Sequence, residues 1–223
     1  VYTADGDFIV GSYQLDDTGT GNEDYRMFYD VSKGAFRAGS AYGAQWDDAN
    51  VGFGSIAMGD ATTASADGST AMGSETTASG DWSTAMGMST TASARYSTAM
   101  GKSTTASSWY STAMGNVTTA SGITSTAMGD STTASGMASI AMGRYAEAGD
   151  GTAGSGDGSL AIGLIDDAVT ITANDEPQVT GIQSMGIFMG NQDPGGDNDT
   201  PLNFAADNTF GLFGGQMVID PAV

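Results

Sequence analysis

The chain reads SIAMGDATTASADG at residues 55–68, STAMGSETTASGDW at 69–82, STAMGMSTTASARY at 83–96 and STAMGKSTTASSWY at 97–110. Two more copies, STAMGNVTTASGIT (111–124) and STAMGDSTTASGMA (125–138), follow, and SIAMGRY (139–145) opens a seventh. A fixed period of this kind is typical of a solenoid, in which each repeat forms one coil that stacks on the next. Each copy holds two short β-prone pieces joined by two turns, so the repeat predicts an all-β solenoid of 14-residue coils.

Strand alternation predicts where the side chains of each coil point. In Ser-Thr-Ala-Met-Gly, Ser and Ala face one way and Thr and Met the other. A coil this short has room inside for small side chains only, so we expect the alanines inside and the methionines outside. The alternative, with Met inside and a monomeric chain, would overpack the coil.

An outward row of methionines would be a large exposed apolar patch on a monomer, so we expect it to lie on the axis of an oligomer. The predicted axis residues are Met58, Met72, Met86, Met100, Met114, Met128 and Met142.

The composition argues against several classes of function. The 223 residues include 26 acidic and 6 basic side chains, for a net charge of -20, so we expect no nucleic-acid partner. His and Cys are absent, which removes imidazole bases, thiolate nucleophiles and metal sites built on them. A glycosidase with two carboxylates is chemically allowed, but a thin coil offers no cleft, so we expect no catalytic residues and no enzyme. No apolar run approaches the roughly 20 residues of a membrane span, so we expect no membrane insertion within these residues.

The 14-residue spacing changes at both ends of the repeat array, which suggests three regions. We expect an N-terminal β segment or cap at 1–34, the solenoid with atypical terminal coils at 35–165, and an acidic C-terminal β region at 166–223. Asp193, Asp197 and Asp199 are weak candidates for Ca²⁺ binding, but they match no known calcium loop. Solvated turns are the favoured interpretation, and no cofactor is expected.

Two outward arrays are candidate contact surfaces. Trp82, Tyr96 and Tyr110 share one turn position and predict an aromatic ladder, with Trp109 beside it. Such aromatics suit a glycan or protein receptor, and they equally suit a seam between neighbouring chains. The outward Thr-x-Ser rows resemble the Thr ladders of ice-binding β-solenoids, although a solvated strand face explains them as well.

The pattern Ser-x-Ala-x-Gly-x-x-(Ala/Thr)-x-Ala resembles the head repeat of YadA-like trimeric autotransporter adhesins, a haemagglutinin-type repeat also found in phage tail-fibre-like proteins. The resemblance covers Ser55 to Gly163. It implies a left-handed parallel β-roll and a homotrimer of three chains side by side. The family usually places Val or Ile where this chain has mostly Thr and Met.

These observations predict a non-enzymatic structural or adhesive protein, extracellular or on a cell surface, whose head contacts a surface, matrix or host cell. A first alternative is the subunit of an extracellular filament, in which the N-terminal strand of one molecule completes the next. A phage tail-fibre-like receptor-binding protein and an ice-binding solenoid are further alternatives.

Overall fold

The computed structural model describes residues 8–11, 24–149, 151–152, 155–164, 178–180, 183–189, 203–204 and 210–213. These residues form strands, turns and two short 3-10 helices, with no α-helix among them. The chain divides into two units, residues 1–117 and 118–223. Each unit contains β-solenoid coils that stack through parallel strands.

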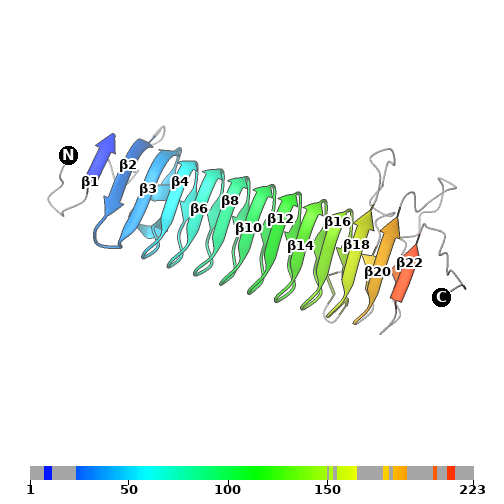
Figure 1. Cartoon of the computed structure of the whole chain (residues 1–223). Coiled ribbons are helices and arrows are strands. Elements are labelled where there is room, and N and C mark those ends of the chain that lie inside the picture. Colours follow the sequence, from blue (N-terminus) through cyan, green and yellow to red (C-terminus); the bar gives the residue numbers. More distant parts are fainter. Residues whose placement is uncertain are drawn as a thin grey trace, which may run out of the picture. The chain divides into compact units, whose positions relative to one another are not determined.

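The first unit has a long sheet and a narrow one, and the long sheet begins with antiparallel strands (Figure 1). The long sheet runs β1 (Phe8–Gly11), β2 (Asp24–Asp30), β3 (Ala35–Ala41), β4 (Ile56–Asp60), β6 (Thr70–Ser74), β8 (Thr84–Met88), β10 (Thr98–Lys102) and β12 (Thr112–Asn116). The narrow sheet holds β5 (Thr63–Ala64), β7 (Thr77–Ala78), β9 (Thr91–Ala92) and β11 (Thr105–Ala106). β1 and β3 flank β2 antiparallel to it, and every pairing from β3 onward is parallel.

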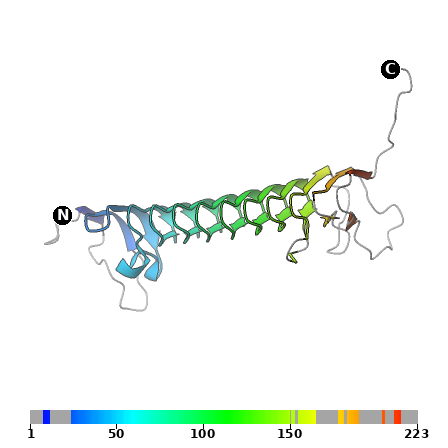
Figure 2. The same cartoon turned by 90° about the horizontal axis from the view of Figure 1, so that it is seen from below.

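The first coil is wider than those that follow it. Between β3 and β4 the chain forms two 3-10 helices, η1 (Ala44–Trp46) and η2 (Asp48–Asn50), where later coils have a two-residue strand. Figure 2 shows this loop standing out beside the narrow coils of the same unit. The expectation that residues near Ala35 form a degenerate first coil agrees with the parallel pairing of β3 and β4.

The second unit continues the same architecture with parallel strands throughout. One sheet contains β14 (Thr126–Asp130), β16 (Ile140–Arg144), β18 (Leu160–Leu164), β20 (Met185–Met189) and β22 (Phe210–Phe213). The other contains β13 (Thr119–Ala120), β15 (Thr133–Ala134), β17 (Glu147–Ala148), β19 (Gln178–Val179) and β21 (Asn203–Phe204). β20 and β22 extend the sheet in parallel beyond residue 165, where we had placed the end of the solenoid. The connections between these last coils differ in length, so the sequence shows no 14-residue period there.

The interior of each coil is lined by four small side chains. In one coil these are Ser97 and Ala99 from the long sheet and Thr104 and Ala106 from the narrow sheet, all fully buried. Thr98 and Met100 alternate with them and point outward. The prediction that Ala lies inside and Met outside is confirmed, and the alternative with Met inside is wrong because small residues already fill the coil.

A row of glycines occupies the next-to-last position of the long strands of the repeats. Gly87 has a φ of 124°, and a Cβ atom there would lie 1.9 Å from the carbonyl oxygen of Gly101 in the next coil. A side chain is therefore excluded by both the backbone conformation and the space. The same clash recurs at Gly59, Gly73, Gly101 and Gly129.

The buried hydroxyls of the interior fall into two groups. The Ser97 hydroxyl donates to the carbonyl oxygen of Ala94 at 2.6 Å, and the equivalent serines of several coils do the same. The inward threonine hydroxyls have no hydrogen-bond partner in the described structure: Thr62, Thr76, Thr90, Thr104, Thr118 and Thr132. A buried hydroxyl without a partner costs about 1–3 kcal/mol of desolvation.

We therefore expect Thr104→Val to leave the stability of the solenoid unchanged or to raise it by about 1 kcal/mol, because Val keeps the shape and removes the unpaired hydroxyl. Denaturant unfolding followed by circular dichroism measures the change. Ala106→Val on the same strand is the control, and its added methyl groups should destabilise the packed coil by about 1–3 kcal/mol. A loss of stability in Thr104→Val would show that this hydroxyl is satisfied.

Candidate functional site

The outward side of the long sheet carries an uncharged apolar surface, which we call the methionine face. In the first unit it consists of Met58, Met72, Met86, Met100 and Met114 with Ile56, Thr70, Thr84, Thr98 and Thr112. Met58 is 40% exposed and the other four methionines are half-buried. In the second unit, Met128 is half-buried and Met142 is 38% exposed. All seven predicted axis residues thus lie on outward faces of their own coils.

The aromatic turn residues of the first unit form a stack. The ring centroids of Trp82 and Tyr96 are 5.2 Å apart with planes 9° from parallel, and those of Tyr96 and Tyr110 are 5.0 Å apart at 8°. The guanidinium of Arg95 lies 5.5 Å from the Trp82 ring centroid and donates to Asp81 at 2.7 Å. The hydrogen bond to Asp81 raises the pKa of Arg95 above its ordinary value.

Stacking changes what the ladder can bind. Both faces of the Tyr96 ring are covered by its neighbours, so this ring presents its edge and its hydroxyl to solvent. A sugar that packs on a ring face needs an uncovered face. Trp109 occupies the adjacent turn position, is 58% exposed and takes part in neither stack. Of the four predicted contact residues, Trp109 is therefore the one best placed to meet a ligand with its ring face.

The backbone under the ladder is strained for residues other than glycine. Trp82, Tyr96 and Tyr110 have φ angles of 54°, 60° and 60°, in the left-handed region. Gly68 precedes them in the same column with a φ of 64°. A left-handed conformation costs an L-residue about 1–2 kcal/mol, which the stacking must offset.

Substitutions at Tyr96 distinguish the stability contributed by ring stacking from the stability lost to backbone strain. We expect Tyr96→Ala to lower the free energy of unfolding by about 1–3 kcal/mol because it removes two stacked pairs and keeps the strain. Tyr96→Gly should be about 1 kcal/mol less destabilising, because glycine adopts this φ without strain. Trp109→Ala is the matched control and should leave thermal stability unchanged. Equal losses in all three variants would contradict the structural role of the ladder.

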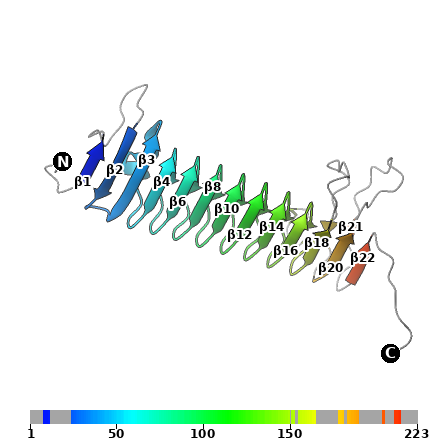
Figure 3. The same cartoon turned by 45° about the horizontal axis from the view of Figure 1, so that its top comes forward.

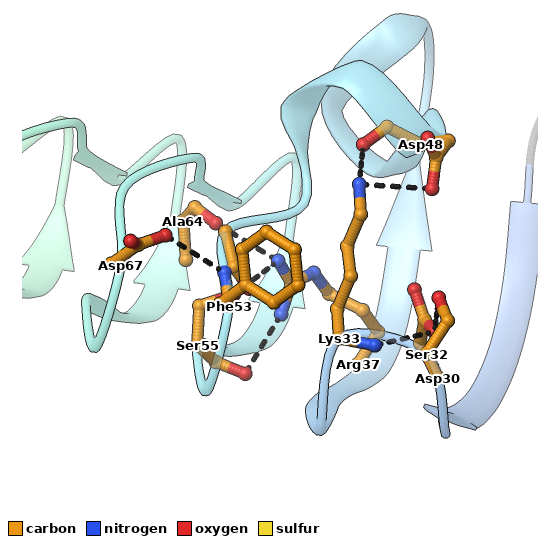
Figure 4. Close-up of polar contacts among 10 residues, drawn as sticks. Asp30, Ser32, Lys33, Arg37, Asp48, Phe53, Ser55, Ala64 and Asp67 are labelled. Atoms are coloured by element: carbon orange, nitrogen blue, oxygen red, sulfur yellow. Dashed lines mark hydrogen bonds and ion pairs between the residues drawn. The ribbon is translucent and has the colours of Figure 1, made fainter.

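A cluster of large side chains closes the N-terminal end of the coil interior (Figure 4). Arg37 occupies the position that Ala57 holds in the next coil, and its side chain is fully buried. Its guanidinium donates to the carbonyl oxygens of Ser55 at 3.1 Å and Ala64 at 2.9 Å, and to the Ser55 hydroxyl at 2.8 Å. Burial lowers the pKa of Arg37 to about 10, and the charge of Asp30 acts in the opposite direction.

The loop around this cluster is held by further contacts. The indole of Trp46 donates to the carbonyl oxygen of Thr62 at 3.0 Å and packs edge-on against Phe28. Lys33 forms an ion pair with Asp48 at 2.9 Å, which ties the β2–β3 turn to η2. Sequence reasoning predicted a β segment or cap at 1–34 but missed the role of Arg37, although Arg in the Ala position of Ala35-Phe-Arg-Ala-Gly39 was a signal for it.

We expect Arg37→Met to destabilise the cap by about 3 kcal/mol or more, because Asp30 loses a buried counter-charge and the carbonyl oxygens of Ser55 and Ala64 each lose one of their two donors. Hydrogen exchange measures the effect locally, with faster exchange in β3 and β4 than in β10. Lys33→Met, which removes the ion pair to the exposed carboxylate of Asp48, should cost less, about 1 kcal/mol. Uniform exchange along the unit in Arg37→Met would contradict a local capping role.

The titratable groups with shifted pKa values give no candidate for proton transfer near neutral pH. Hydrogen bonds from Ser40 and Tyr42 lower the pKa of Asp60, and the bond to Asp60 raises the pKa of Tyr42 to about 12. Both shifts move away from the neutral range that general acid-base catalysis uses.

The predicted calcium candidates Asp193, Asp197 and Asp199 lie outside the described residues. Within the part of the chain that the structure describes, no three acidic side chains form a group that could hold a metal ion. None of the helices described there is long and apolar enough to span a membrane.

Comparison with known families identifies the repeats. A family model for the YadA head domain repeat, built on two copies, matches residues 51–76, 64–90, 78–104, 92–118 and 120–146. The coils of residues 51–146 are YadA head repeats. No curated protein matches the chain. The cap around Arg37 precedes the first matched YadA head repeat, and β18, β20 and β22 follow the last one.

Proposed function

We propose that this chain is a non-enzymatic, extracellular adhesive head that acts as a homotrimer of left-handed β-rolls. Three copies lie side by side with their methionine faces on the common axis. The observation that carries the proposal is the methionine face itself, which is outward, apolar and uncharged in a chain of net charge -20. The YadA head family, a family of structural adhesins, supports the same reading.

A second copy of the chain is the partner that fits this face. The face repeats once per coil, with each Met in register with the Met of the next strand. A parallel copy has the same rise per coil, so rows that meet at one coil meet at every coil. A partner with a different spacing would move out of phase within a few coils. The absence of charge on the face also lets acidic chains approach there without direct repulsion.

The turns are the surfaces that such a trimer offers to a receptor. The strands of the repeats are nearly constant, whereas the exposed turn residues differ from coil to coil. Trp109 and the edges of the aromatic ladder form the largest aromatic group on these turns, and a glycan or protein receptor is the partner that they suit.

Met100→Asp tests the assembly. It places one carboxylate from each chain on the shared axis, and we expect the dissociation constant of the oligomer to rise by more than about a hundredfold, which corresponds to about 3 kcal/mol. Sedimentation equilibrium measures the change, and circular dichroism verifies that the coils remain folded.

The matched control is Ser107→Asp, which adds the same charge on the exposed side of the narrow sheet. This variant should assemble like the unmodified chain. An unchanged oligomer in Met100→Asp would remove the methionine face from the interface.

The filament alternative requires the N-terminal strand to pair with a neighbouring molecule. In the structure β1 pairs with β2 of its own chain, with Phe8 opposite Tyr29, and this pairing does not favour strand donation. A phage tail-fibre-like protein would use the same trimer on a different carrier. The outward Thr63, Thr77 and Thr91 are in register, as ice binding would need, but the rows beside them are serines without a methyl group.

A further inference from the structure

In strand β2 the usual distribution of side chains is reversed, with charged residues inside and large apolar residues outside. The charged side chains of Arg26 and Asp30 point inward and are buried, 4% and 8% exposed. Its large apolar and aromatic side chains point outward, with Tyr25 58% exposed, Met27 36% and Tyr29 43%. A strand that faces water on one side normally carries its polar residues there.

The register of the strands places these outward residues on the same side as the methionine face. Tyr29 lies opposite Phe36 and Met27 opposite Ala38 across the β2–β3 pair. Phe36 in turn lies beside Ile56, and Ala38 beside Met58, across the β3–β4 pair. Directly paired residues project from the same side of a sheet, so the two rows run unbroken from β2 into the repeats. Figure 3 shows β2, β3 and β4 side by side in this sheet.

The apolar character of one row rises toward the N-terminal end. The row contains Thr in the coils of β6, β8, β10 and β12, then Ile56 in β4, Phe36 in β3 and Tyr29 in β2. No outward position of either row in these strands is charged. Protein interfaces often have a few large aromatic residues that contribute most of the binding energy. Tyr29 and Phe36 have this character at one end of a face otherwise made of Thr and Met.

We propose that the outward face of β2 and β3 is the N-terminal part of the self-association interface, covered by a second copy of this chain, with Tyr29 and Phe36 as its aromatic anchors. This inference rests on the proposed side-by-side assembly, and it extends that interface beyond the YadA head repeats. Continuity with the methionine face and the burial of Arg26 and Asp30 select a second copy as the occupant.

The first test uses the unmodified chain. Hydroxyl-radical footprinting read by mass spectrometry compares the assembled protein with the Met100→Asp variant. We expect Tyr29 and Met27 to react at least about fivefold more slowly in the assembled protein, while Trp109 on the turns reacts equally in both. Equal reactivity of Tyr29 in both samples would overturn the inference. The same result is expected if the β2–β3 hairpin contacts a receptor and not a second copy of the chain. This measurement needs no substitution in the hairpin, so it holds even where a hairpin variant fails to fold.

The second test uses the double variant Met27→Asp and Tyr29→Asp, measured by sedimentation equilibrium. We expect its dissociation constant to rise at least tenfold. The control is Val31→Asp, which adds charge to the exposed turn after β2 and should assemble normally. If Met100→Asp dissociates the oligomer and the double variant does not, the inference fails while the proposed trimer stands. A monomeric unmodified chain would contradict both.

Discussion

The width of the coil interior is the constraint on which the rest of this structure depends. Four small side chains fill each coil completely, and the glycine row brings neighbouring backbones too close for even a Cβ atom. Close packing of this kind leaves no inner position for a Leu, Met or aromatic side chain. Every large apolar residue of the repeats must therefore lie on the outside. The exposed methionine face is a direct consequence of the narrow coil, and so is the need for a partner to cover it.

The same narrowness explains why the N-terminal end is closed by unusual residues. A stack of coils ends in an open cross-section with unpaired carbonyl groups and a small apolar interior. Arg37 gives the carbonyl oxygens of Ser55 and Ala64 a second donor, and Trp46 donates to that of Thr62. A long side chain fits at this position because the first coil is widened by η1 and η2. The cap thus depends on an exception to the rule that governs the coils behind it.

The repeat region could be predicted from the sequence because one geometric rule, alternation in a narrow coil, decides the direction of each strand side chain. The position of Arg37 could not be predicted in the same way, since its role depends on a loop that has no counterpart in the repeat. A C-terminal β region was predicted, but its continuation of the parallel stacking in β20 and β22 was not, because their connections differ in length from the 14-residue spacing. The repeat spacing predicts that Trp82, Tyr96 and Tyr110 form one column, but the covering of both Tyr96 ring faces depends on ring geometry that spacing alone does not determine.

The two kinds of surface on each coil are under different physical demands. In the proposed trimer, the methionine face must keep its residue size and spacing at every coil, because it packs against an identical row. The turns need only one backbone condition, a residue that tolerates the left-handed region, and residues as different as Trp82, Thr124 and Ala138 meet it. Turn side chains can therefore change without disturbing either the coil interior or the assembly. In the proposed trimeric head, receptor contacts can therefore vary at the turns while the strands maintain the assembly.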